Sequence, residues 1–239
     1  MALVGGNPSG AFLIGILSIM ENHYNKFRNR TQAGQLLARK LHSYANQRGL
    51  LILALPRGGV PVAHEVAKEL NAELDICLVR KLGVPGHREL AMGAIASGGI
   101  KELNTNIINT ERISKRAIDE VLEEETRELS RRELAYRGNR PLVNIKGRTV
   151  ILVDDGMATG VTMRAAVKLL KIQGPAKLVV AVPVTHPSVY FNLKILVDEV
   201  VCLVMPEEFY SIGLWYEDFA QTTDEEVCQL LNNPNVLSQ

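Results

Sequence analysis

Cysteine is scarce in this chain of 239 residues, and the few cysteines form no pattern. Cys77, Cys202 and Cys228 are odd in number and far apart, and no Cys-x-x-Cys pair occurs. This argues against a disulfide framework and against a structural zinc site, because both need cysteines in pairs or at recurring close spacing. A reducing cytoplasm is therefore the simplest compartment to expect.

An excess of charge of either sign is also absent. The chain has 27 basic and 26 acidic residues, which gives a formal net charge of +1 at pH 7. No overall field attracts the chain to nucleic acid or to an anionic membrane surface, so neither is expected as a partner. A site for an anionic ligand has to be local.

Long apolar runs are missing as well. The apolar segment Ala11–Met20 is too short to span a bilayer, and no Lys or Arg precedes it, so a signal peptide is weakly supported. We expect residues 1–20 to form a loosely attached extension and residues 21–239 to form a single domain, a size that allows an ample core.

Two motifs of other enzyme classes are missing. His64-Glu65 lacks the second histidine of a zinc-protease helix, because position 68 is Lys68. No Walker lysine motif occurs, which disfavours a kinase or phosphatase on an α/β sheet.

The most informative stretch is Val150–Thr162, which reads Val-Ile-Leu-Val-Asp-Asp-Gly-Met-Ala-Thr-Gly-Val-Thr. Its four apolar residues, three of them β-branched, are typical of a strand buried on both faces of a parallel sheet. Asp154 and Asp155 follow where the strand should end, and a loop of small residues then enters the helical run Met163–Ile172. Such a loop lets backbone N–H groups converge on an anion at a helix N-terminus.

The two carboxylates narrow the choice of anion. Phosphate alone would be repelled by them, whereas a ribose 5-phosphate can donate its vicinal hydroxyls to the carboxylates while its phosphate lies in the loop. The pattern therefore indicates a sugar-phosphate site. An ordinary strand, aspartate turn and threonine cap would produce a similar sequence.

The same residues resemble the 5-phosphoribosyl-1-pyrophosphate (PRPP) motif of the type I phosphoribosyltransferases. The resemblance implies that Asp154 and Asp155 hold the ribose hydroxyls, act in catalysis and are the carboxylates available to Mg²⁺. It also implies that the 5-phosphate is bound by Gly156, Met157, Ala158, Thr159, Gly160, Val161 and Thr162.

A second strand, glycine turn and helix occurs earlier in the chain. Leu50–Leu55 reads as a buried strand, Pro56-Arg57-Gly58-Gly59 as the turn, and Val60–Leu70 as an amphipathic helix. The glycines permit positive φ or an unusual peptide geometry, and Arg57 supplies charge. In the resembled family this loop binds pyrophosphate, which assigns that role to Arg57, Gly58 and Gly59; a plain turn also explains the glycines.

Two cations follow the next expected strand, Asp75–Val79. Arg80 and Lys81 would stand at the carboxyl end of a parallel strand, where open α/β sheets place ligands, and the resemblance gives them a role in holding pyrophosphate during catalysis. A solvated charge pair is the alternative. The segment Leu82–Glu89 reads as flexible, and a long charged helix is expected from Thr110 to about Tyr136.

The C-terminal part is rich in aromatic residues. It holds the single Trp and several Tyr and Phe among acids, and we expect residues 205–239 to contribute a hood over the site. Phe209 and Glu217 stand in an order similar to the segment that closes the base pocket in purine-salvage members, which makes them candidate base-binding residues. Core packing is the alternative.

The alternation of strands and helices predicts a doubly wound, mostly parallel α/β sheet. The resemblance implies an enzyme that moves ribose 5-phosphate from PRPP to a nitrogenous base or related acceptor, releases pyrophosphate and uses Mg²⁺; it is also compatible with a homodimer. The alternative is a non-catalytic protein on the same fold that senses PRPP or a nucleotide.

Overall fold

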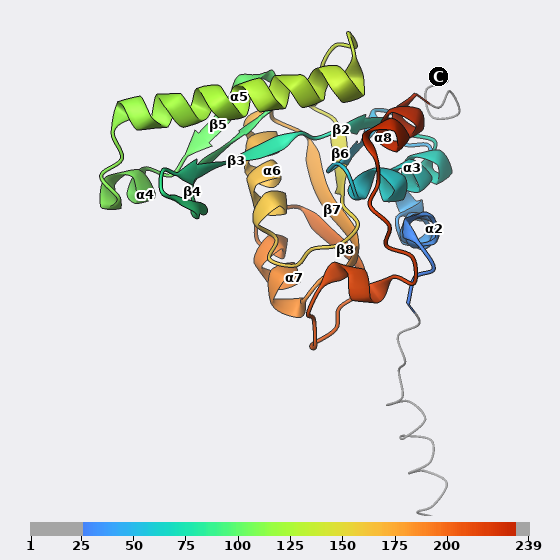
Figure 1. The fold of residues 1–239 in the computed structure, drawn as a ribbon. Coiled ribbons are helices and arrows are strands. Elements are labelled where there is room, and N and C mark those ends of the chain that lie inside the picture. Colours follow the sequence, from blue (N-terminus) through green and yellow to red (C-terminus); the bar gives the residue numbers. More distant parts are fainter. Residues whose placement is uncertain (1–25, 233–239) are drawn as a thin grey trace, which may run out of the picture.

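A five-stranded parallel sheet forms the centre of the computed structural model, which describes residues 26–232 (Figure 1). Its strands are β1 (Leu50–Ala54), β2 (Glu73–Ile76), β6 (Thr149–Val153), β7 (Lys177–Val184) and β8 (Glu199–Val204). They pair in the order β2-β1-β6-β7-β8, and every neighbouring pair is parallel. The prediction of a doubly wound, mostly parallel sheet is confirmed. The N-terminal extension predicted at residues 1–20 lies outside the described residues.

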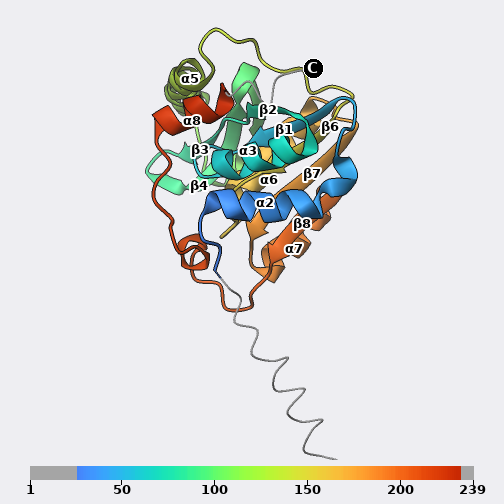
Figure 2. The ribbon, with the colours of Figure 1, turned by 90° about the vertical axis from the view of Figure 1, so that its right-hand side faces the viewer.

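Helices cover both faces of this sheet (Figures 1 and 2). The helices α2 (Arg30–Lys40) and α3 (Gly59–Leu70) lie on one face, and α6 (Val161–Ile172) and α7 (Pro187–Lys194) lie on the other. Because side chains alternate along a strand, Ile52 of β1 packs in the core beneath α3 while Leu53 packs in the core beneath α6. Both faces of the central strands are therefore buried, as their uninterrupted apolar sequence requires.

The segment between β2 and β6 forms an arm, residues 79–137, that projects from the core (Figure 1). It contains a three-stranded antiparallel sheet of β3 (Val79–Val84), β4 (His87–Ala96) and β5 (Ile100–Leu103), followed by α4 (Thr105–Thr110) and the long α5 (Lys115–Arg137). The long helix expected from Thr110 begins later, at Lys115, and Ser114 caps it. Two further expectations were wrong here. Asp75–Val79 is not one strand, because β2 ends at Ile76 and β3 belongs to the second sheet. Leu82–Glu89 is not a loose loop but the tip of the β3–β4 hairpin.

The helix α2 is capped at its N-terminus by a side chain. Asn29 is the cap, because its Oδ1 accepts a hydrogen bond of 2.9 Å from the N–H of Gln32. The helix stops at Lys40, and the chain turns through a short 3-10 helix, η1 (His42–Tyr44), before β1. None of the helices within residues 26–232 is both long and apolar enough to cross a membrane.

The described part of the tail runs back across the molecule after β8. It forms a 3-10 turn, η3 (Ile212–Trp215), and ends with α8 (Asp224–Leu231), which packs against α3 and α5. Phe27, near the start of the described chain, pairs with this tail: its N–H donates to the carbonyl of Trp215 at 2.9 Å, and its carbonyl accepts from the N–H of Glu217 at 2.8 Å. The start of the described chain is thus joined to the tail.

The three cysteines should differ in reactivity. Cys77 and Cys202 are buried and Cys228 is half-buried. Burial raises the pKa of the Cys77 thiol to about 12 and that of Cys202 to about 11, so neither forms much of the reactive thiolate at pH 8. We expect a chromogenic thiol reagent at pH 8 to modify one thiol quickly and the other two only after denaturant is added. Three fast thiols would contradict the burial of Cys77 and Cys202.

Candidate functional site

The two glycine loops predicted from the sequence lie side by side. Ala54, the last residue of β1, is the register partner of Val153, the last residue of β6. The loops that follow, residues 56–59 and 154–160, therefore leave the same edge of the sheet from neighbouring strands. The strand order reverses between β1 and β6, and open α/β sheets place ligands at the carboxyl edge of such a switch point.

The glycines of the first loop serve close packing. A Cβ on Gly58 would lie 2.1 Å from Oδ2 of Asp155, and one on Gly59 would lie 2.8 Å from the carbonyl oxygen of Val153. Gly58 has φ −59°, so positive φ is not the reason for this glycine. The unusual peptide geometry anticipated for this loop is present as a cis bond between Pro56 and Arg57. Only residues without a side chain let the two loops approach so closely.

Asp155 is held by a residue that the sequence analysis missed. The Nε of Arg30 donates to Oδ2 of Asp155 at 2.8 Å, and the two side chains are only 11% and 10% exposed. The hydroxyl of Tyr216 donates to the backbone carbonyl of Asp155 at 2.6 Å. Arg30 and Asp155 are 125 positions apart, and Arg30 belongs to no motif that would have marked it.

Asp154 has a different environment. It is partly exposed, and its Oδ1 accepts a hydrogen bond of 2.9 Å from the N–H of Asp155. Burial, followed by the charge of Asp155, raises the pKa of Asp154 well above its usual range. Burial also raises the pKa of Asp155, but the guanidinium of Arg30 opposes that rise. Of the two, Asp154 is therefore the carboxyl that takes up a proton more readily.

The loop after these carboxylates leads into α6. Gly160, the residue before α6, has φ +67°, a left-handed conformation that glycine adopts without strain, and no side chain caps the helix. Met157 fixes the loop to the end of β7, because its N–H donates to the carbonyl of Val184 and its own carbonyl accepts from the hydroxyl of Thr185. Thr159 and Thr162 are exposed beside the uncapped N–H groups. This arrangement suits a phosphate at the helix N-terminus.

Arg57 reaches the C-terminal helix. Its Nη1 lies 3.5 Å from Oδ1 of Asp224 in α8, and Asp224 also accepts a hydrogen bond of 2.6 Å from the hydroxyl of Tyr136. Both charged side chains are more than a third exposed, so the ion pair is weak. Arg57 can therefore turn to an anionic ligand at small cost.

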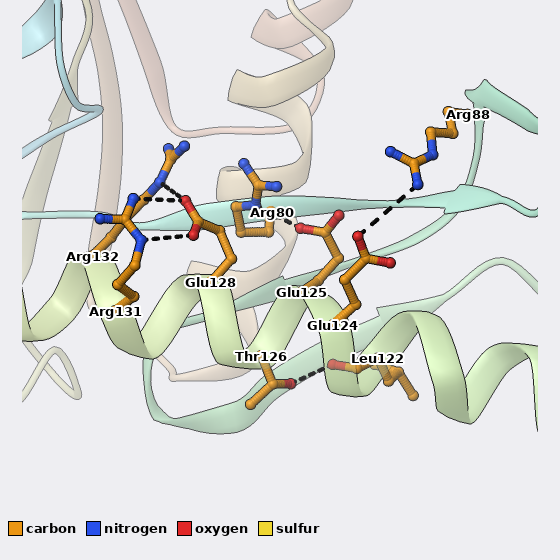
Figure 3. A network of polar contacts seen from close by, with 9 residues as sticks. All are labelled: Arg80, Arg88, Leu122, Glu124, Glu125, Thr126, Glu128, Arg131 and Arg132. Atoms are coloured by element: carbon orange, nitrogen blue, oxygen red, sulfur yellow. Dashed lines mark hydrogen bonds and ion pairs between the residues drawn. The ribbon is translucent and has the colours of Figure 1, made fainter.

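Arg80 and Lys81 are placed differently from the expectation. They lie inside β3 of the arm and not at the carboxyl end of a parallel strand. Figure 3 shows Arg80 beside α5, where its Nε is 2.6 Å from Oε2 of Glu125; Lys81 pairs with Glu89 of the hairpin at 3.3 Å. All four residues line an open cleft of about 580 Å³ between the hairpin and α5, which neither glycine loop lines. The sequence predicted too long a strand at β2, because apolar residues continue from Ile76 to the start of β3. Arg80 and Lys81 were therefore expected at the end of the wrong strand.

Phe209 and Glu217 both lie in the tail. Phe209 is half-buried in a cluster with Val184 and Tyr216, whereas the side chain of Glu217 is exposed. The ring that packs most closely on Arg30, the partner of Asp155, is that of Phe219: the guanidinium carbon of Arg30 lies 3.9 Å from its centroid. Part of the aromatic tail thus supports Arg30.

The carboxylates could hold a metal only with help from a ligand. Within residues 26–232 no group of three or more His, Cys, Asp or Glu side chains is close enough to bind a metal ion. Asp154 and Asp155 each have one oxygen engaged by protein donors, so they offer few free positions. Mg²⁺ is typically bound through one or two carboxylates together with substrate phosphates and water, and the pair fits that mode.

The chain is similar to several known proteins. The family model described as the phosphoribosyl transferase domain matches residues 21–214. Two Mycobacterium tuberculosis proteins named as candidate phosphoribosyl transferases, Rv0571c of strain H37Rv and MT0597 of strain CDC 1551, are 41% identical to this chain over 206 residues. The match covers 86% of this chain and 46% of theirs, so the chain spans about half the length of these relatives. The crystal structure of TT1426 from Thermus thermophilus is 42% identical, with a TM-score of 0.77 over 86% of this chain and 97% of that one.

Proposed function

Because the chain belongs to the phosphoribosyl transferase domain family, we propose that it transfers ribose 5-phosphate from PRPP to a nitrogenous acceptor and releases pyrophosphate. The observation that carries the proposal is the packing of the two glycine loops at one sheet edge, with Gly58 directly against Asp155. This places a candidate pyrophosphate loop beside a candidate sugar-phosphate loop, as a ligand with phosphates at both ends of a ribose requires.

The proposed roles follow from the geometry. The uncapped N-terminus of α6 and residues 156–162 receive the 5-phosphate, and the acidic pair faces the ribose hydroxyls. Arg57 and the turn Gly58–Gly59 receive the pyrophosphate, with the N–H of Gly58 as the backbone donor, because the N–H of Gly59 already donates to the carbonyl of Leu55 at 3.1 Å. When bound, Mg²⁺ would neutralise charge on the pyrophosphate, and Asp154 and Asp155 are the carboxylates that would help to hold it. Arg80 and Lys81 can contribute only if they leave Glu125 and Glu89.

The chemistry is a displacement at the anomeric carbon. The bond between that carbon and the pyrophosphate oxygen breaks with its electron pair staying on pyrophosphate, and a nitrogen of the acceptor forms the new bond and loses a proton. The transition state resembles an oxocarbenium ion, so stabilisation of the leaving group and a fixed sugar are the main contributions of the protein.

A binding protein without transfer is the second candidate. It is favoured by one observation: Arg80 and Lys81, two of the cations assigned to pyrophosphate, are paired with carboxylates and line a cleft that neither glycine loop lines. Such a protein would sense PRPP or a nucleotide and would use the same loops.

One experiment separates the two candidates. Pyrophosphate release from PRPP is measured with Mg²⁺ across a panel of free bases and small amines. Acceptor-dependent release that is lost in the Asp154→Asn/Asp155→Asn double variant supports transfer. Tight PRPP binding without release for any acceptor supports the sensor, and absence of PRPP binding contradicts both.

Arg57→Ala is expected to weaken PRPP roughly tenfold to a hundredfold, the effect of losing a hydrogen bond to a charged group worth about 1.5–3 kcal/mol. Ribose 5-phosphate, which lacks the pyrophosphate, should bind nearly as before. Calorimetric titration of both ligands checks this, with Arg48→Ala as the control because Arg48 is exposed and precedes β1 at its opposite end. Equal losses for both ligands would show that the two loops are misassigned.

Phe209→Ala tests the base pocket proposed for Phe209 and Glu217. If Phe209 stacks on the acceptor ring, a nucleotide product should bind more weakly by roughly 1–3 kcal/mol while PRPP is nearly unaffected. The neighbouring Tyr210 is 81% exposed, and Tyr210→Ala is the matched control. Because Phe209 also packs near Val184, a parallel loss of both ligands together with a lower melting temperature would mean that it serves the core instead.

A further inference from the structure

The two adjacent carboxylates differ in their partners. Asp155 is 7% exposed, its carboxylate is bound by Arg30, and its carbonyl is bound by the hydroxyl of Tyr216. Asp154 is partly exposed, and its side chain accepts only the N–H of Asp155 among the hydrogen bonds of the described residues. Asp155 is thus buried and ion-paired, whereas Asp154 has no ion pair and is the more exposed of the two.

Asp155 also forms the surface on which the other loop rests. Its Oδ2 is the atom that a Cβ on Gly58 would meet at 2.1 Å, and it is the same atom that accepts from Arg30. A shift of this carboxylate would therefore disturb both the Pro56–Gly59 loop and Arg30. Asp154 also meets this loop, because a Cβ on Gly59 would lie 3.1 Å from its Oδ1, but no ion pair within residues 26–232 joins Asp154 to an arginine.

Arg30 is itself held firmly. Its Nη1 donates to the carbonyl of Ala220 at 2.6 Å, and its guanidinium lies over the ring of Phe219. A planar guanidinium fixed by a ring and a carbonyl has little freedom to follow a ligand, so it orients the carboxylate that it binds. The N-terminal end of α2 and the tail thus meet at Asp155.

We propose that the two carboxylates have separate roles: Arg30 and Asp155 are positioning residues that fix the Pro56–Gly59 loop, and Asp154 is the carboxylate that binds the sugar hydroxyls. The part concerning Asp154 rests on the proposed function. The part concerning Arg30 and Asp155 rests on contacts within the protein and can be tested without any ligand.

The two parts predict opposite effects on stability. Without Asp155, the guanidinium of Arg30 stays buried and loses its counter-charge, which is strongly destabilising. Without the charge of Asp154, the protein no longer has to bury that charge beside the carboxylate of Asp155, and the amide oxygen of asparagine can still accept the N–H of Asp155. The same Asp-to-Asn change at neighbouring positions therefore gives a matched pair of variants.

The test begins with melting temperatures of the variants without added ligand. We expect Asp155→Asn and Arg30→Met each to lower the melting temperature by roughly 5–15 °C, and Asp154→Asn to leave it unchanged or raise it. The double variant Arg30→Met/Asp155→Asn should lose less than the two single losses added together, because the pair is removed as a unit. Arg39→Ala, an exposed arginine on the same helix, should have no effect.

Ligand binding then separates the two roles. Inorganic pyrophosphate and ribose 5-phosphate are titrated, each with Mg²⁺ and well below the melting temperatures. Each variant should lose affinity mainly for one of the two ligands, and the affected ligand should differ between the variants. Asp155→Asn should weaken pyrophosphate about tenfold and ribose 5-phosphate much less, whereas Asp154→Asn should do the reverse. If Asp155→Asn does not fold, Arg30→Lys, which keeps the charge but loses the planar fork, replaces it and should show a milder form of the same pattern.

Two results would overturn the proposal. Equal melting temperatures for Asp154→Asn and Asp155→Asn would show that Asp155 has no positioning role. Equal loss of ribose 5-phosphate in both variants would show that both carboxylates bind the sugar. If the unmodified protein binds neither ligand, the proposed function fails, while the melting temperatures still decide the role of Arg30 and Asp155.

Discussion

Gly58→Ala is expected to abolish measurable PRPP binding. The added Cβ would lie 2.1 Å from Oδ2 and 2.7 Å from Cγ of Asp155, so either the Pro56–Gly59 loop or the carboxylate has to move. Movement of the carboxylate breaks the hydrogen bond from Arg30, and movement of the loop displaces Arg57. Overpacking costs about 1–3 kcal/mol, and a broken buried ion pair adds about 3–5 kcal/mol, so a loss of more than about a hundredfold in affinity is expected.

Calorimetric titration with PRPP and Mg²⁺ measures this loss, and thermal unfolding measures the accompanying destabilisation. Gly49→Ala is the control, because Gly49 has φ +77° but no atom within 4 Å of an added Cβ. It should cost about 1–2 kcal/mol of stability through backbone strain and leave PRPP binding intact. A Gly58→Ala protein that binds PRPP normally would mean that the contact between the two loops is unimportant for the ligand.

Asp154→Asn is expected to weaken PRPP binding and to raise the stability of the protein. Asparagine cannot accept the charge-assisted hydrogen bonds of a carboxylate, so PRPP should bind roughly tenfold to a hundredfold more weakly. The pKa of Asp154 is raised, chiefly by burial, so its ionisation costs stability. The wild-type protein then loses stability as the pH rises through the folded-state pKa of Asp154, and asparagine avoids that loss.

The sign of this effect can be checked by unfolding both proteins across pH in the presence of a chelator. The variant should melt at a higher temperature at pH 8, and its advantage should vanish below about pH 4, the range in which an aspartate of the unfolded chain is itself protonated. Asp119→Asn removes a charge from an exposed site on α5 and should show neither change. A variant that melts lower than wild type at pH 8 would contradict a raised pKa at Asp154.

Much of the fold could be predicted because the parallel strands have a strong sequence signature. The ends of β7 and β8 coincide with the apolar runs Lys177–Val184 and Glu199–Val204. The arm was missed because Gly83 and Gly86 resemble loop residues. Gly86, at φ +80°, turns the β3–β4 hairpin, and Gly83 lies within β3, where a Cβ would meet the carbonyl oxygen of Arg88 at 2.9 Å. Both glycines are therefore part of a regular hairpin and do not mark a flexible segment.

The candidate site could be predicted only where its residues are neighbours in sequence. The loops 56–59 and 154–160 each follow a buried strand, and the pairing of β1 with β6 places them together. Arg30 could not be found in this way, because its partner Asp155 is distant in sequence and its own surroundings are those of an ordinary helix start. The position of Arg80 was misjudged because it depends on where β2 ends, and strand ends are weakly marked in sequence.

The arm has a consequence for the order in which the chain folds. The pairing of β1 with β6 joins Leu50 to Thr149, and the arm occupies most of the intervening chain. Its own strands β3, β4 and β5 pair with their immediate neighbours in sequence, so they close short loops that form quickly. Once the arm has formed, the unstructured chain between β1 and β6 is much shorter, and the entropy lost on joining these two strands falls accordingly. Early local structure in the arm would thus accelerate the pairing on which the meeting of the two glycine loops depends.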